Sequence, residues 1–149
     1  MRYFLDTEFN GFGGALLSLA LVPDDGEEFY VTLILNEPLH PWVEQHVIPY
    51  IDHVPVGLVS PPMSRESAAA AIADYLSQDP EPEIVADWPD DIAYFNSALL
   101  VGPGQMVPVP MLRFRLIPMP GFSTAENSAV PHNALHDARA LRDHVLGME

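Results

Sequence analysis

The stretch RYFLDTEFNGFGGALLSLALVPDDGEEFYVTLIL, residues 2–35, decides the fold because it predicts three consecutive strands. Apolar runs predict these strands at 2–5, 15–22 and 28–35, separated by a glycine-rich loop and by the turn segment Pro-Asp-Asp-Gly at 23–26. The last two strands are close enough in sequence to form an antiparallel hairpin. The first strand delivers Asp6 at its end.

Helices and further strands alternate through the rest of the chain. Apolar spacing, caps and prolines predict helices at 42–51, 64–77, 89–100 and 133–146, strands at 83–87 and 112–117, and a polar loop at 121–131. This order predicts an α/β fold in which an antiparallel hairpin lies beside parallel strands. With 149 residues, 48% of them hydrophobic, the chain is expected to form a single domain over residues 1–149.

Composition limits the chemistry that the chain can perform. There are no cysteines, which excludes disulfides, a thiolate nucleophile and any cysteine-based metal site, so a metal would be bound by carboxylates and histidines. No apolar run reaches the length of about 18 residues needed for a membrane span, and the N-terminus lacks a signal segment, so a cytoplasmic protein without a membrane partner is expected.

The charge balance is strongly acidic. The chain has 21 Asp and Glu against six arginines and no lysine, for a formal net charge of -15. The basic footprint of a nucleic-acid binder is therefore missing. This does not exclude a nucleic-acid partner, because bound divalent ions would change the sign of the charge locally.

The first candidate site is the pair Asp6 and Glu8 at the end of the first strand. Side chains two apart in a strand point to the same side, and two adjacent carboxylates repel unless a cation or proton separates them. Taken alone, the pair fits either solvated acids or a metal site. Phe12, four residues beyond Glu8, fits either a core residue or a ring on which a base stacks.

The second candidate site lies at the start of the last helix. His132 precedes Asn133, a good helix cap, and Asp137 lies one turn into the helix. An imidazole near a bound water can take its proton, because the unperturbed pKa of histidine suits general base catalysis. A zinc site that uses His132 and His136 is an alternative, but the glutamate of the metalloprotease motif is missing.

A third acidic group lies between these sites, at the junction of the strand 83–87 and the next helix. It contains Asp87, Asp90 and Asp91, and a helix N-terminus attracts acids for electrostatic reasons alone. Asp91 is the preferred candidate, because the apolar residues Ile92 and Phe95 would bury one helical face and aim Asp91 toward the sheet. Asp87 remains the alternative.

Together these segments resemble the three exonuclease motifs of the DEDDh superfamily of 3'-5' exonucleases. Asp-Thr-Glu-Phe-Asn-Gly-Phe at 6–12 is similar to the first motif, and His-Asn-Ala-Leu-His-Asp-Ala-Arg at 132–139 is similar to the third. The segments 2–9, 16–22 and 42–49 are similar to small stand-alone bacterial and phage 3'-5' exoribonuclease-like proteins. The resemblance implies a ribonuclease H-like fold, a mixed five-stranded sheet flanked by helices.

The resemblance also implies a role for each residue. Asp6, Glu8 and Asp137 would hold one divalent cation, with Asp6 and Asp91 contributing to a second, and Mg²⁺ or Mn²⁺ suits such ligands. His132 would be the general base. Of the two phenylalanines that follow Glu8, the second would stack on the terminal base and the first would support the site from behind; these are Phe12 and Phe9.

The implied reaction is hydrolysis that releases 5'-mononucleotides from single-stranded or short nucleic acid. RNA is favoured over DNA as the partner, and a homodimer is a candidate oligomeric state by the same analogy. Two alternatives stay open. The chain could be a catalytically weak binding module that keeps the fold, or a hydrolase of dinucleotides and other small phosphodiesters, which the strong negative charge would disfavour less.

Overall fold

Five strands form one mixed sheet in the computed structural model, which describes residues 1–149. They are β1 (Arg2–Phe9), β2 (Leu16–Pro23), β3 (Phe29–Thr32), β4 (Glu83–Ala86) and β7 (Arg113–Leu116), in the order β3-β2-β1-β4-β7. β2 runs antiparallel to both β1 and β3, whereas β4 runs parallel to both β1 and β7. The predicted α/β fold with an antiparallel hairpin beside parallel strands is therefore confirmed.

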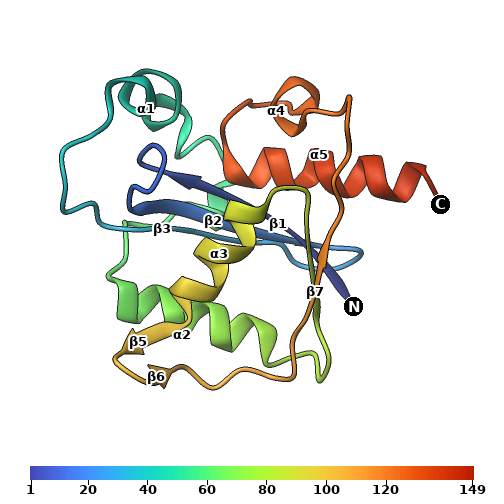
Figure 1. The fold of residues 1–149 in the computed structure, drawn as a ribbon, viewed down its shortest axis with the longest axis horizontal. Coiled ribbons are helices and arrows are strands. Elements are labelled where there is room, and N and C mark those ends of the chain that lie inside the picture. The colour runs from blue at the N-terminus through green and yellow to red at the C-terminus, as the bar shows by residue number, and fades with distance from the viewer.

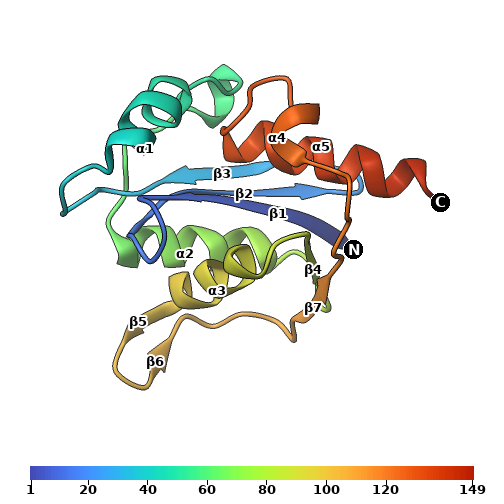
Figure 2. The ribbon, with the colours of Figure 1, turned by 45° about the horizontal axis from the view of Figure 1, so that its top comes forward.

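Helices cover both faces of the sheet, as Figures 1 and 2 show. One face carries α2 (Arg65–Leu76) and α3 (Pro89–Ala98); the other carries α1 (Pro41–His46), α4 (Thr124–Asn127) and α5 (Ala134–Gly147). Each layer has its own hydrophobic cluster, and a smaller third cluster holds α1 against Leu17 of β2. None of the helices has the length and apolar content that crossing a bilayer would require.

The alternation of side chains along β1 divides the strand between the two layers. Tyr3 and Leu5 belong to the cluster under α2 and α3, whereas Phe4 belongs to the cluster under α5. Because the period of a strand is two, Asp6 and Glu8 share the face of Phe4 and point toward the α5 layer. The central strand therefore carries both carboxylates to the start of the last helix.

Four predicted boundaries were wrong. The strand expected at 2–5 continues to Phe9, because residues 6–9 also pair with β2, so Asp6 and Glu8 lie inside the strand. The helix expected at 42–51 ends at His46, since Pro49 has no N–H for a helical hydrogen bond, and a 3₁₀ turn continues over Ile48–Tyr50. The strand expected at 28–35 ends at Thr32, after which Leu33 forms only an isolated bridge with Met63. The helix expected at 89–100 ends at Ala98.

Three short elements were not predicted. β5 (Leu100–Gly102) and β6 (Gln105–Met106) form a hairpin that projects below α2 and α3 in Figure 1. The helix α4 lies inside the expected loop 121–131, where Ser123 caps it by accepting a hydrogen bond from the Glu126 N–H. Elements of two to four residues carry too little periodicity to be recognised in a sequence.

Candidate metal centre and active site

A cleft of about 320 Å³ opens beside the end of β1 that carries Asp6 and Glu8. Its walls come from β1, the junction of β4 with α3, the segment around α4, and the start of α5. The titratable side chains that line it are Asp6, Glu8, Asp87, Asp91, His132 and Asp137. The structure therefore brings together the three groups of candidate residues that are far apart in the sequence.

Asp91 reaches the cleft from the opposite layer of the fold. Pro89 begins α3, and Asp91 lies in the first turn, buried to 4% exposure, with its Oδ1 accepting hydrogen bonds from Thr7 of β1. The Thr7 N–H donates at 3.1 Å and the Thr7 hydroxyl at 2.6 Å. Asp87, directly after β4, also lines the cleft but makes no such contact with β1. Both candidate carboxylates are thus present, and Asp91 is the one tied to the central strand.

His132 is held in an unusual backbone conformation. Its φ of 65° makes it the one non-glycine residue in the left-handed region, where a side chain is strained. Asn133 fixes the neighbouring backbone: its Oδ1 caps α5, and its Nδ2 donates to the Tyr50 carbonyl at 2.8 Å. The ring of Trp42 in α1 meets the His132 ring edge to face at 5.0 Å. These contacts direct the imidazole into the cleft.

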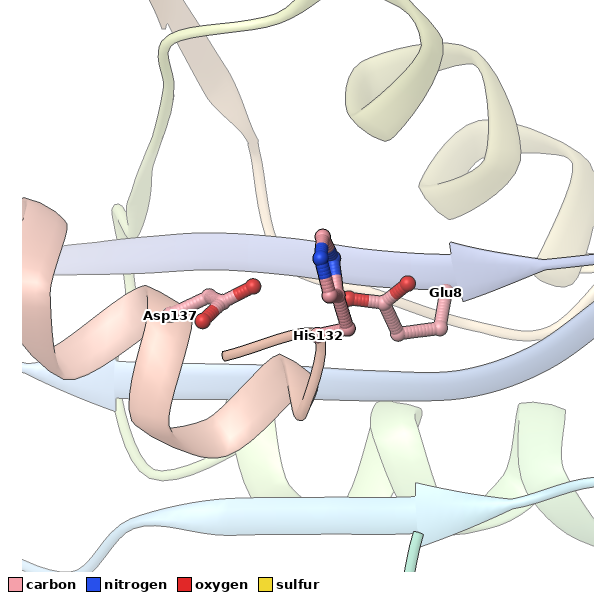
Figure 3. Close-up of side chains that lie close together, drawn as sticks. All are labelled: Glu8, His132 and Asp137. Atoms are coloured by element: carbon pink, nitrogen blue, oxygen red, sulfur yellow. The ribbon is translucent and has the colours of Figure 1, made fainter. Parts of the chain in front are cut away.

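Glu8, His132 and Asp137 are the residues that converge most closely. One ligand atom from each lies within 4.8 Å of the others. Figure 3 shows the carboxyl groups of Glu8 and Asp137 turned toward the His132 ring, which comes from the loop just before α5. His132 lies just before α5 and Asp137 one turn into it, so the first helical turn brings both side chains beside the end of β1.

The acids of the cleft have raised pKa values. Burial, together with the charges of Asp91 and Glu8, raises the pKa of Asp6 well above its usual value, and burial with the Asp137 charge does the same to Glu8. Burial raises the pKa of Asp91 to about 7 and that of Asp137 to about 6. Burial is the largest cause in each case, and repulsion from neighbouring carboxylates adds to it for Asp6 and Glu8.

Burial raises the pKa of Asp87 as well, so the fifth acid of the cleft shares this behaviour. The imidazole changes in the opposite sense. Burial and the nearby His46 lower the pKa of His132, so its neutral form predominates at neutral pH. A neutral imidazole among carboxyl groups can accept a proton or a cation.

The donor set fits a hard divalent cation. Asp6 Oδ2 and Asp137 Oδ1 are buried and accept no hydrogen bond from the protein, so each has an oxygen available for a ligand. No arginine lines the cleft, and the chain has no lysine. Carboxylate oxygens are the ligands that Mg²⁺ and Mn²⁺ prefer. Bound cations would stabilise the ionised carboxylates, whose pKa values burial and mutual repulsion raise.

The two phenylalanines of the first motif differ in place. Phe9 lines the cleft and is stacked on Tyr94 of α3, with ring centroids 4.4 Å apart, which agrees with a supporting position. Phe12 is 98% exposed on the glycine-rich loop and does not line the cleft. The interpretation of Phe12 as a core residue is therefore wrong, and its role in base stacking stays a prediction.

Other sequence interpretations can be compared with the structure. His136 does not join the cleft, because its Nε2 lies 2.8 Å from the His53 carbonyl oxygen, which removes the zinc pair with His132. Arg139 of α5 forms a two-pronged ion pair with Glu28, away from the cleft. The sequence pattern did not indicate Trp88, which lines the cleft between Asp87 and the first turn of α3. Its place directly before Pro89 was the available signal.

The chain matches no protein-family model and no curated protein. Function is therefore inferred from the residues of the cleft. Five carboxylates around one imidazole, with two buried unpaired oxygens and no arginine, form a site whose chemistry fits divalent cations.

Proposed function

We propose that this protein is a metal-dependent 3'-5' exonuclease of the DEDDh type with a ribonuclease H-like fold. It would release 5'-mononucleotides from single-stranded or short nucleic acid, with RNA favoured over DNA. The observation that carries the proposal is the convergence of four carboxylates and one imidazole in a single cleft, from segments at both ends and the middle of the chain; they are Asp6, Glu8, Asp91, His132 and Asp137.

The carboxylates divide naturally into two sets of ligands around Asp6. Asp6, Glu8 and Asp137 would hold one divalent cation, and Asp6 with Asp91 would contribute to a second. Bound Mg²⁺ or Mn²⁺ would neutralise negative charge on the scissile phosphodiester and on the leaving 3' oxygen. The unpaired Asp6 Oδ2 and Asp137 Oδ1 support this assignment.

His132 would act as the general base. Its lowered pKa keeps the ring neutral, so a ring nitrogen can take the proton of a water molecule that attacks the terminal phosphodiester. The constrained backbone and the edge contact with Trp42 limit the orientations of the ring. Holding the base in place removes part of the entropy cost of the reaction.

The direct test is incubation of the purified protein with 5'-labelled single-stranded RNA and DNA of identical sequence, in Mg²⁺, Mn²⁺ or EDTA. A 3'-5' exonuclease yields a ladder of shortened labelled products and free nucleoside 5'-monophosphates in either metal, and neither in EDTA. A faster ladder on RNA supports the preferred substrate. Absence of metal-dependent shortening of both polymers would overturn the proposal.

A pair of isosteric variants controls this test. Asp6→Asn removes a charge shared by both sets of ligands and is expected to abolish the activity. Asp25→Asn removes a charge from the exposed turn between β2 and β3, outside the cleft, and is expected to leave the rate unchanged. Equal rates for Asp6→Asn and wild type would mean that the chemistry takes place elsewhere.

A second candidate function is hydrolysis of dinucleotides or other small phosphodiesters. The net charge of -15 and the absence of arginine and lysine from the cleft favour it, because a short substrate suffers less repulsion than a long one. Rates on a dinucleotide and on longer oligomers of the same sequence separate the two activities. A binding module without catalysis would show no turnover on either, and metal titration by calorimetry would then find no tight divalent site.

A further inference from the structure

We propose that the base of the terminal nucleotide stacks on the side chain of Trp88, and that this contact provides much of the binding energy for the substrate. The inference rests on the proposed exonuclease function, which requires the last nucleotide to enter the cleft. Trp88 lines the cleft, immediately between Asp87 and the first turn of α3. It is the tryptophan of the cleft wall, and 60% of its surface is exposed.

The indole of Trp88 is fixed in place before any ligand arrives. Pro89 restricts the preceding residue to an extended conformation, and Trp88 has φ -131° and ψ 134°. Its Nε1 donates a hydrogen bond to Asp90 Oδ2 at 3.1 Å. A large apolar side chain that is both exposed and held by its polar edge loses little conformational entropy when a ring stacks on it.

The other aromatic side chains of the cleft are already engaged. Phe9 is stacked on Tyr94, and Phe122 is stacked on His144 with ring centroids 3.9 Å apart and an angle of 13° between the rings. Phe12, the stacking residue expected from the sequence, lies outside the cleft. Trp88 is therefore the aromatic side chain best placed to accept a base.

The distribution of positive charge explains why stacking would matter here. All six arginines are committed away from the cleft: Arg2 bonds to Asp24 and Glu149, Arg65 to the Ser97 carbonyl, Arg115 to Glu83, Arg139 to Glu28 and Arg142 to Asp143, while Arg113 lies 4.0 Å from Glu81. No lysine exists to replace them. Stacking on an indole is uncharged, so a strongly acidic protein can use it without a basic groove.

The test compares two oligonucleotides that differ only in the last nucleotide, which carries a base in one and is abasic in the other. Wild type is expected to prefer the substrate with the base. Trp88→Ala should lower kcat/KM for that substrate by about tenfold, which is typical of the loss of one base stack, and should leave the abasic substrate nearly unaffected. Trp88→Phe keeps a smaller ring and should recover part of the preference.

Met111→Ala is the matched control, because Met111 is an exposed apolar side chain outside the cleft. It should retain the wild-type preference. The role of Trp88 alone is overturned if active wild type shows no preference for the substrate with the base. It is also overturned if Trp88→Ala lowers kcat/KM equally for both substrates, or for neither. Wild type that shortens neither substrate in Mg²⁺ or Mn²⁺ overturns the exonuclease function, and the role of Trp88 with it.

Discussion

At the two ends of the central strand β1, acidic side chains have opposite electrostatic surroundings. At the N-terminal end, the amine of Met1 lies 3.0 Å from Asp79, and Arg2 donates to Asp24 at 3.1 Å. Burial raises the pKa of Asp79, but the amine and neighbouring hydrogen-bond donors outweigh it, so the pKa lies below its usual value. At the other end, Asp6 has carboxylates as its charged neighbours and its pKa is raised.

This difference separates a structural ion network from a candidate site. Acids that stabilise a fold are paired with cations of the protein, as Asp79 and Asp24 are. Buried acids without such partners lower the stability of the fold when no ligand is bound. Acids of this kind are concentrated at functional sites. An aspartate near β1 therefore stabilises the fold at the N-terminal end of the strand and forms part of the candidate site at the other end.

The largest expected effect concerns the base at the acidic end. His132→Ala should lower kcat by about 10²- to 10⁴-fold, the range for losing a general base. It should keep the rise in Tm that Mn²⁺ produces in wild type, because the carboxylates remain. Turnover assays and thermal unfolding with and without Mn²⁺ measure both quantities. A lost metal response would instead make His132 a ligand.

The second effect is the dependence of stability on pH in EDTA. Asp91 and Asp137 have folded-state pKa values of about 7 and about 6, above the ordinary value of 3.8, so their contribution is fully present below the ordinary value. It is lost as the pH rises through the folded values. We expect the Tm of the metal-free protein to fall between pH 4 and pH 7, as measured by calorimetry.

Saturating Mn²⁺ should flatten this pH profile above pH 6, because it stabilises the ionised carboxylates; a metal concentration of 100 times Kd is worth about 2.7 kcal/mol. Asp6→Asn should make the metal-free profile flatter, since it removes one repelling charge. Asp25→Asn, in the exposed turn, is the control that should follow wild type. A Tm in EDTA that rises over this range would contradict the electrostatic account of the cleft.

A smaller effect is expected from salt. The net charge of -15 repels a long polynucleotide, and monovalent salt screens that repulsion, so kcat/KM on a long oligomer should rise several-fold as salt is added at saturating Mg²⁺. A dinucleotide should show a much weaker response. Nucleases with basic grooves behave in the opposite way. A steep fall with salt would indicate a basic contact that the cleft does not contain.

The smallest effect belongs to the paired end of β1. Asp79→Asn removes the partner of the N-terminal amine, which is 45% exposed, so the cost should be at most about 1 kcal/mol in the free energy of unfolding. Denaturant unfolding of this variant beside Asp6→Asn compares the two ends directly. The comparison fails if both substitutions shift stability in the same direction in EDTA.

Much of the fold was predictable from local patterns. The apolar runs around 2–5, 15–22 and 83–87 became β1, β2 and β4, and the Asn133 cap marked the start of α5 correctly. The end of α1 and the short elements β5, β6 and α4 were not predicted, because a missing N–H or a few residues of pairing leave little trace in composition.

The site was predictable in its residues but not in its geometry. The resemblance to the exonuclease motifs predicted that Asp6, Glu8, His132 and Asp137 share one site, and the structure brings all four to the same cleft. It did not predict that Asp91 would bond to Thr7, because that contact joins an element on the other face of the sheet. The exposure of Phe12 was equally hidden, since a glycine-rich loop can turn either way.

The sequence by itself determined the order of the longer strands and helices, the absence of thiol chemistry, and a set of acids and one histidine suited to divalent metal. These properties are local or compositional, so they need no folded chain. Only the tertiary structure decided which acids have no positively charged side chain beside them and which histidine faces those acids. It also decided that Trp88 is exposed on the wall of the cleft. Burial and pairing arise between segments distant in sequence, and they alone set the electrostatics of the site.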